Sequence, residues 1–196
     1  MEKLADAEFD VHPLIRHRWS PRAFSDRSVT GAELRSMLEA ARWAASCFNE
    51  QPWYFIAATR EDSGEFDRML ECLVPTNQVW ARRAGALLLS VARTAFSRSG
   101  KHNLHAVHDV GQAAAQLALQ ATALGLAVHQ MAGFDRDLAQ RVYAIPSNCE
   151  PVAAIAVGHP GDPQTLPDEL RDRERASRTR RPQSEFVFCG TWGRVM

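Results

Sequence analysis

The stretch from Asn103 to Met131, NLHAVHDVGQAAAQLALQATALGLAVHQM, carries the strongest structural signal in this chain. Its first part is rich in alanine and predicts a long helix over residues 103–124, which Gly125 can end in a left-handed conformation. The following residues, 127–131, predict a short strand. Because the helix carries many small side chains, another helix can approach it closely. We therefore expect it at the centre of the fold or in a dimer interface.

Shorter segments on both sides of this stretch predict a mixture of strands and helices. Thr30 and Glu33 have the spacing of a capping box, so a helix of about four turns should begin there. Helices and strands do not alternate strictly, which favours the α+β class, with residues 1–196 forming one domain. The other predicted elements are helices over 11–18, 62–72 and after Asp135, strands over 53–59, 85–92 and 151–158, and a strand-like segment at 184–188.

Composition argues against several classes of protein. The 196 residues contain 23 basic and 23 acidic side chains, so no net charge favours a nucleic acid or an anionic membrane. The four cysteines are scattered without a Cys-x-x-Cys pair, which argues against a zinc site or a disulfide framework. The N-terminus is acidic, and no apolar run is long enough to span a bilayer. We expect a cytoplasmic protein that binds neither nucleic acid nor membrane.

The segment Arg18-Trp19-Ser20-Pro21-Arg22 could bind an anion. Guanidinium groups match phosphate oxygens bidentately, and the Ser20 hydroxyl adds a further donor. The segment follows a predicted helix and should form a turn at Pro21. The alternative is a solvated basic turn without a ligand.

A second polar segment, Ser46 to Trp53, lies between a predicted helix and a predicted strand. Loops at such junctions often present polar groups to ligands. Asn49 and Gln51 each offer one acceptor and two donors, which suits the amide-like edge of a heterocycle. The alternative is that Asn49 and Pro52 only shape the turn while Trp53 anchors the core.

Gly133 lies where a predicted strand ends and a predicted helix begins. Without a Cβ atom at this position, a flat ring could approach the backbone closely. Free N–H groups at the start of the helix would point toward such a ring. The alternative is an ordinary glycine turn before a capped helix.

Four patterns in this order resemble the FMN-dependent nitroreductase family. The family's Arg-x-Ser-x-Arg-x-Phe pattern is matched by residues 18–24, and its Ser-x-x-Asn-x-Gln-Pro-Trp loop by residues 46–53. Its Gly-Leu and Gly-Phe-Asp patterns are matched within residues 125–135, and its closing Arg-x-Arg by residues 178–180. The order and the approximate spacing hold from residue 12 to residue 194, which is nearly the whole chain.

The resemblance implies a fold, an assembly and a reaction. The fold would be a central mixed, mostly antiparallel sheet flanked by helices, in an intertwined homodimer with FMN sites at the interface. The reaction would pass hydride from NADPH or NADH to flavin N5 and on to an electron-poor acceptor, such as a nitroaromatic or a quinone, by a ping-pong mechanism. Two alternatives stay open: a flavin-binding or storage protein without significant turnover, and a hydrolase that uses Cys47.

The resemblance also implies which residues hold the cofactor's phosphate. Arg18 and Ser20 near the start of the chain, with Arg178 and Arg180 near its end, would bind it together. Arg22 would lie near the flavin N1 and the C2 oxygen, where reduction places negative charge. No side chain would be catalytic and no metal would be needed, because the flavin carries the chemistry.

Further implied contacts concern the flavin ring. Asn77 would bind the pyrimidine edge, and the backbone of Ala132 and Gly133 would bond to O4 and N5. Residues 46–49 would reach a flavin held mainly by the partner subunit. The complete predicted cofactor-binding set is Arg18, Trp19, Ser20, Arg22, Ser46, Cys47, Phe48, Asn49, Gln51, Asn77, Met131, Ala132, Gly133, Arg178 and Arg180.

This chain departs from the family's pattern at three positions. Ala132 stands where many members have Glu, Ala45 where many have Pro, and Trp80 where others have Lys. Without that Glu and that Lys, fewer charged side chains would surround the flavin. The redox potential and the choice of nicotinamide are therefore not fixed by the resemblance.

Two remaining clusters have ordinary structural interpretations. His102, His105 and His108 recur every three residues, and we expect a solvated or interface face of a helix rather than a metal site. The charged run 171–181 alternates in sign, so we expect a solvated helix leading into the two C-terminal arginines rather than a nucleic-acid patch.

Overall fold

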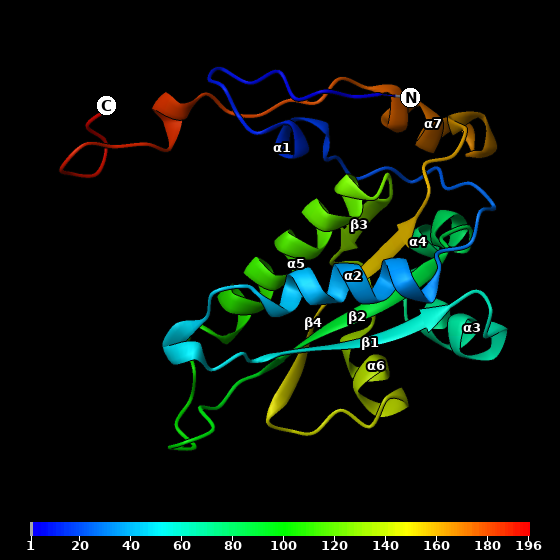
Figure 1. Ribbon diagram of the computed structural model, residues 1–196, viewed down its shortest axis with the longest axis horizontal. Coiled ribbons are helices and arrows are strands. Elements are labelled where there is room, and N and C mark those ends of the chain that lie inside the picture. The colour runs from blue at the N-terminus through cyan, green and yellow to red at the C-terminus, as the bar shows by residue number, and fades with distance from the viewer. Residues whose placement is uncertain (1) are drawn as a thin grey trace.

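A four-stranded antiparallel sheet organises the chain (Figure 1). The computed structural model describes residues 2–196. The strands follow the order β1-β2-β4-β3, and each neighbouring pair is antiparallel. This confirms the α+β class and the mostly antiparallel sheet. The strands are β1 (Trp53–Thr59), β2 (Ala86–Arg93), β3 (Ala127–Met131) and β4 (Cys149–Gly158).

Helices cover both faces of this sheet. Helices α2 and α5 pack on one face, and α3, α4 and α6 pack on the other. The α-helices are α1 (Pro13–His17), α2 (Gly31–Arg42), α3 (Ser63–Glu71), α4 (Pro75–Ala81), α5 (Ala106–Ala123), α6 (Arg136–Val142) and α7 (Asp168–Arg175). Short 3₁₀ turns are η1 (Cys47–Asn49), η2 (Pro163–Thr165) and η3 (Gln183–Glu185).

The buried strand β2 explains why two helical layers are needed. Seven of its eight residues are buried, since it pairs with a strand on each side and is covered on both faces. Leu87 and Leu89 pack into the cluster beneath α3, α4 and α6, whereas Leu88 packs beneath α2 and α5. This alternation of side chains between the two faces is the period of a strand. The continuous apolar run of β2 therefore contributes side chains to the hydrophobic core on each face of the sheet.

Local signals in the sequence are confirmed at three helix ends. The backbone N–H of Glu33 donates to the Thr30 hydroxyl at 3.2 Å, and the N–H of Thr30 donates to the Glu33 carboxylate at 2.8 Å, which completes the capping box. Gly125 has a φ of +72° beyond the end of α5. The Asp135 carboxylate accepts from the N–H of Leu138 at 2.8 Å and caps α6.

Three expectations need correction. Helix α4 was not predicted, although Pro75 stands at its first position. The run 171–181 is helical only as far as Arg175, and it is not fully solvated, because Glu174 is buried. The segment 184–188 is not a strand, because its only β-pairing with the rest of residues 2–196 is an isolated bridge between Phe188 and Val195. A strand needs a neighbouring backbone, and the C-terminal end extends away from the sheet (Figure 1).

The N-terminal and C-terminal segments lie side by side along one edge of the molecule (Figure 1). The Nζ of Lys3 donates to the carbonyl oxygen of Glu174 at 2.8 Å, and Arg178 Nη1 donates to that of Lys3 at 2.8 Å. Among residues 2–196, no helix has the length and apolar character needed to cross a membrane.

Candidate functional site

Arginines from both ends of the chain gather at one place. Arg18 donates to the Ser20 hydroxyl at 3.4 Å, and Arg178 donates to the carbonyl oxygen of Arg16 at 3.0 Å. The pKa of Arg18 is lowered from its ordinary value, first because its guanidinium is partly buried and then because the positive charges of Arg178 and Arg180 lie nearby. The structure thus places these residues near one another, and their binding of a phosphate stays a prediction.

This arginine cluster, formed by Arg18, Arg178 and Arg180, makes no ion pair within the described chain, although Asp6 lines a small hollow together with Arg178 and Arg180. Within the part of the chain that the structure describes, none of the three lies within 4.0 Å of a carboxylate oxygen. The pKa of Arg178 is also lowered, by burial and then by the charge of Arg180. Positive charges held together at a cost in free energy are typical of a site that receives an anion.

A hollow of about 320 Å³ opens beside Arg18 and Ser20. Its other walls are the outward face of α5 and the edge strand β3. The small side chains of α5 leave room for an object against the helix, and β3 continues from the hollow toward the turn at Gly133. The lining residues are Arg18, Ser20, Ala115, Ala118, Leu119, Val128 and Gln130.

The turn at the end of β3 brings two predicted site residues together. Asn77 Nδ2 donates to the carbonyl oxygen of Gly133 at 3.0 Å, and the N–H of Val74 donates to the same oxygen at 3.1 Å. A Cβ atom on Gly133 would lie 2.6 Å from Asn77 Nδ2. The φ of Gly133 is not positive, so a glycine is required here by the close approach of α4 rather than by a left-handed turn.

Three other predicted residues, two at the end of β3 and one beside Ser20, differ in exposure. Ala132 is exposed, so its backbone is accessible. The Met131 side chain is buried in the core, which leaves only its backbone available to a ligand. The Trp19 ring is half-buried, with Lys3 Nζ 4.7 Å from its centroid. Trp19 thus packs against the N-terminal segment.

The loop 46–51 has a strained backbone and lies apart from the arginine cluster. Phe48, Asn49 and Gln51 have φ values of 53°, 56° and 50°, which are uncommon for residues with a Cβ atom. The N–H of Gln51 donates to the Ser46 hydroxyl at 3.0 Å, and this bond helps to hold the loop. The Phe48 side chain is 90% exposed. Strain and an exposed aromatic ring together suggest a binding loop.

The position of this loop separates it from the arginine cluster within one chain. The N–H of Cys47 donates to the Asp109 carboxylate at 3.0 Å, which fixes the loop at the first turn of α5 (Figure 1). The hollow lies farther along α5, at Ala115 to Leu119. The predicted set is therefore divided into two groups at different points along the same helix.

Sequence reasoning missed two residues that hold the 20–23 segment. Both oxygens of the Glu174 carboxylate accept from the N–H of Arg22, and one of them also accepts from Ala23. His129 Nδ1 lies 3.0 Å from the Pro21 carbonyl oxygen. The available signal was weak: Glu174 follows Leu170 by four residues, which places both on the same face of α7.

His129 should make stability fall in mild acid. Burial, opposed only in part by the bond to Pro21, lowers the pKa of His129 to about 4. The unfolded chain therefore binds a proton from about pH 6.5 downward, whereas the folded chain resists it, and stability is lost as pH falls through that range. From about pH 7 to about pH 5, the native chain should lose about 2 kcal/mol more than His129→Gln. Urea unfolding at both pH values measures this, and equal losses in the two chains would contradict it.

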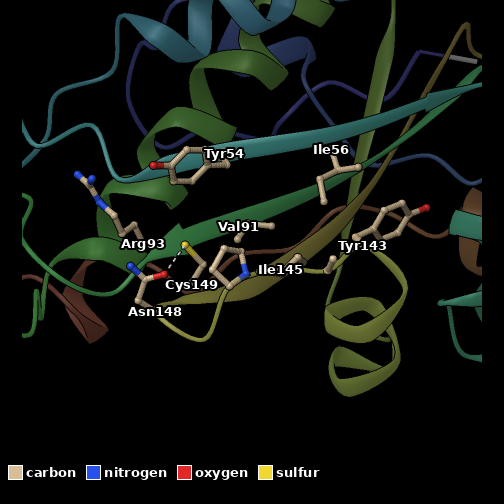
Figure 2. A pocket seen from close by; sticks show the side chains of 10 residues that line it. Tyr54, Ile56, Val91, Arg93, Tyr143, Ile145, Asn148 and Cys149 are labelled. Carbon is tan, nitrogen blue, oxygen red and sulfur yellow. Dashed lines mark hydrogen bonds between the residues drawn. The ribbon is translucent and has the colours of Figure 1, made fainter.

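A larger hollow of about 500 Å³ lies on the opposite face of the sheet, beside α6 (Figure 2). Tyr54, Val91 and Cys149 line it from three strands, and none of the predicted site residues does. Burial raises the pKa of the Cys149 thiol, so it is not poised as a nucleophile. Cys47, on which the hydrolase alternative rests, does not line this hollow.

The remaining candidates do not assemble a centre. Cys47 is half-buried, with its backbone bound to Asp109, and no histidine is bonded to it in the described chain. His102, His105 and His108 are exposed. Within residues 2–196, no group of three or more metal-ligating side chains could hold an ion.

Both the sequence and the fold are similar to those of known proteins. The model of the family described as Nitroreductase family matches residues 15–159. A crystal structure of an oxidoreductase containing FMN gives a TM-score of 0.89 at 36% identity, covering 95% of each chain. A provisionally named nitroreductase in complex with FMN, from Desulfovibrio desulfuricans, gives 0.71 at 26% identity, covering 93% of this chain and 99% of that one.

A sequence relative extends the comparison. A protein from Archaeoglobus fulgidus, provisionally named NADH dehydrogenase/NAD(P)H nitroreductase, is 27% identical over 153 residues, which are 76% of this chain and 84% of its own. The family model spans most of the chain, and the sheet with its two helical layers superposes on a solved FMN-containing oxidoreductase. On this evidence the chain belongs to the nitroreductase family.

Proposed function

We propose that this protein is an FMN-dependent oxidoreductase that takes its reducing equivalents from NADPH or NADH. The observation that carries the proposal is the arginine cluster, three cations from opposite ends of the chain without a carboxylate partner among the described residues. Two solved relatives contain FMN, which has a phosphate at one end and a flat ring at the other. When bound, FMN would supply hydride acceptance at N5 and delivery to an electron-poor acceptor such as a nitroaromatic or a quinone.

The residues present suit each part of this cofactor. The arginine cluster and the Ser20 hydroxyl would hold the phosphate through charge-assisted hydrogen bonds. Arg22, whose backbone is fixed by Glu174, would place a positive charge near the ring. Asn77 uses its Nδ2 on Gly133, which leaves its Oδ1 as an acceptor for the pyrimidine edge.

We further propose a homodimer that completes the site. One face of α5 presents small and apolar residues at helical spacing that the described chain leaves wholly or partly uncovered, and apart from the helix's own backbone no described atom lies within 4 Å of a Cβ atom built on Gly111. Two copies of α5 crossing antiparallel there would bring the 46–51 loop of each chain to the hollow of the other. Val107, Gly111 and Ala115 of α5 are exposed, Leu119 is half-buried, and Leu104, just before the helix, is exposed.

Kinetics separate this proposal from a flavin storage protein. An oxidoreductase that releases oxidised nicotinamide before the acceptor enters should give parallel double-reciprocal plots when NADPH or NADH and a quinone are varied together. Comparing the two nicotinamides also determines which one is used. Bound flavin with nicotinamide oxidation no faster than that of free FMN would favour storage instead.

Gly133→Val should sharply reduce flavin content. The added side chain would displace Asn77 and Val74, which lie 2.6 Å and 3.0 Å from the position of a Cβ atom on Gly133, and so would disturb the proposed pyrimidine contact. Flavin absorbance per protein and melting temperature, measured on the same sample, test this. The matched control is Gly64→Ala in α3, where the nearest atom is 3.7 Å away. An unstable Gly133→Val protein that still carries a full complement of reducible flavin would contradict the proposal.

A further inference from the structure

Glu174 is an unusual residue in the C-terminal part of the chain. It is 1% exposed, although it lies on α7, a short helix rich in charged residues. Its carboxylate accepts the N–H of Arg22 at 2.9 and 3.0 Å and the N–H of Ala23 at 3.0 Å. A buried carboxylate is stable only with such donors. Glu174 thus closes the backbone turn that carries Ser20 and Arg22.

The end of α7 and residues 176–180, which follow it, are fastened to the N-terminal segment. Lys3 Nζ donates to the carbonyl oxygens of Glu174 and Ala176, at the end of α7. Arg178 follows and donates to the carbonyl oxygens of Lys3 and Arg16. The two arginine-bearing segments therefore meet directly, at the bond from Arg178 to Arg16, and also through α7, which the Glu174 carboxylate joins to residues 22 and 23.

We propose that Glu174 is a positioning residue for the phosphate-binding cradle formed by the arginine cluster and Ser20. It does not touch the ligand; it sets the distance between Arg18 and Ser20 on one segment and Arg178 and Arg180 on the other. The inference rests on the proposed FMN function. It goes beyond that proposal because it assigns the assembly of the cradle to one buried carboxylate.

Geometry and electrostatics predict opposite results when this carboxylate is neutralised. Glu174 is a negative charge near Lys3, whose pKa it acts to raise, and removing that charge would make the surroundings more attractive to phosphate. If Glu174 acts by position, however, replacing one carboxylate oxygen by an NH2 group sets a donor against the Arg22 N–H, weakens the bonds that hold residues 22 and 23, and loosens the cradle. The sign of the change in FMN affinity therefore distinguishes the two effects.

The test compares FMN with riboflavin, which lacks the phosphate, on Glu174→Gln apoprotein by quenching of flavin fluorescence. The preference for FMN over riboflavin should fall about tenfold, because the cradle acts on the phosphate. General damage to the fold would weaken both flavins alike. Combining Glu174→Gln with Arg18→Ala should cost less than the sum of the two single changes, since both act through one cradle.

Glu169→Gln is the matched control, because Glu169 is on the same helix but is exposed and paired with Arg173. It should leave both affinities unchanged. If Glu174→Gln does not fold, Glu174→Asp replaces it in the test, because it keeps the charge but withdraws it from the Arg22 N–H. Its preference for FMN over riboflavin should fall in the same way. Tighter FMN binding, or an equal loss for both flavins, overturns the inference. A native chain with no preference for FMN over riboflavin would instead overturn the proposed function and the inference with it.

Discussion

Arg18→Ala and Arg180→Ala should each raise the Kd for FMN by about ten- to a hundredfold, because a charge-assisted hydrogen bond contributes about 1.5–3 kcal/mol. The two residues come from opposite ends of the chain, yet the charge of Arg180 acts on Arg18. Both changes also relieve repulsion within the arginine cluster, so the variants should fold at least as well as the native chain. The expected loss is therefore one of ligand affinity without a loss of stability.

Fluorescence titration of apoprotein with FMN measures this loss, and thermal unfolding checks the fold. Arg173→Ala is the matched control, since Arg173 lies on α7 and is exposed and paired with Glu169. It should leave the Kd unchanged. Unaltered FMN affinity in both Arg18→Ala and Arg180→Ala would remove the basis for a phosphate site here.

Gly111→Arg should convert the protein to a monomer and release its flavin. A Cβ atom at Gly111 has no neighbour within 4 Å in one chain, so a folded subunit can accommodate the longer side chain. In a dimer that packs α5 against its copy, the same side chain would enter the interface and separate the helices. The 46–51 loop of the partner would then be lost from the site.

Deletion of residues 183–196 should have a related effect. This C-terminal arm carries Phe186, Trp192 and Val195 on its surface, and Trp192 is 90% exposed. Exposed apolar side chains on an extended arm are typical of a segment that packs on a partner. We expect monomer, flavin loss or aggregation, measured by light scattering and absorbance. A flavin-loaded monomer of the native chain at micromolar concentration would rule out the dimer.

The fold was predictable where the signal was local. Strand β1 and the helix caps at Thr30 and Asp135 follow from side-chain type and spacing within a few residues. The segment 184–188 has the composition of a strand, but strand formation depends on a neighbouring backbone that its own chain does not provide. Composition alone could not decide that outcome.

The site divides in the same way. The residues that resemble family patterns, such as Arg18 and Arg178, could be named from the sequence, and the structure brings them together. Glu174 and His129 could not, because their importance arises from contacts with residues 21–23, more than a hundred positions away. The sequence also could not show why position 133 is a glycine. A side chain there would collide with Asn77, which is distant in the sequence, whereas no left-handed turn requires the glycine.

The dependence on FMN and a nicotinamide is tested by the absorption spectrum of the purified native protein, recorded anaerobically before and after addition of NADPH or NADH. We expect the bands of oxidised flavin in the purified protein and their bleaching on addition of at least one of the two nicotinamides. Riboflavin 5′-phosphate should be the flavin released on denaturation. A protein that holds no flavin and takes up none from added FMN, or one whose flavin bands persist with both nicotinamides, would contradict the account.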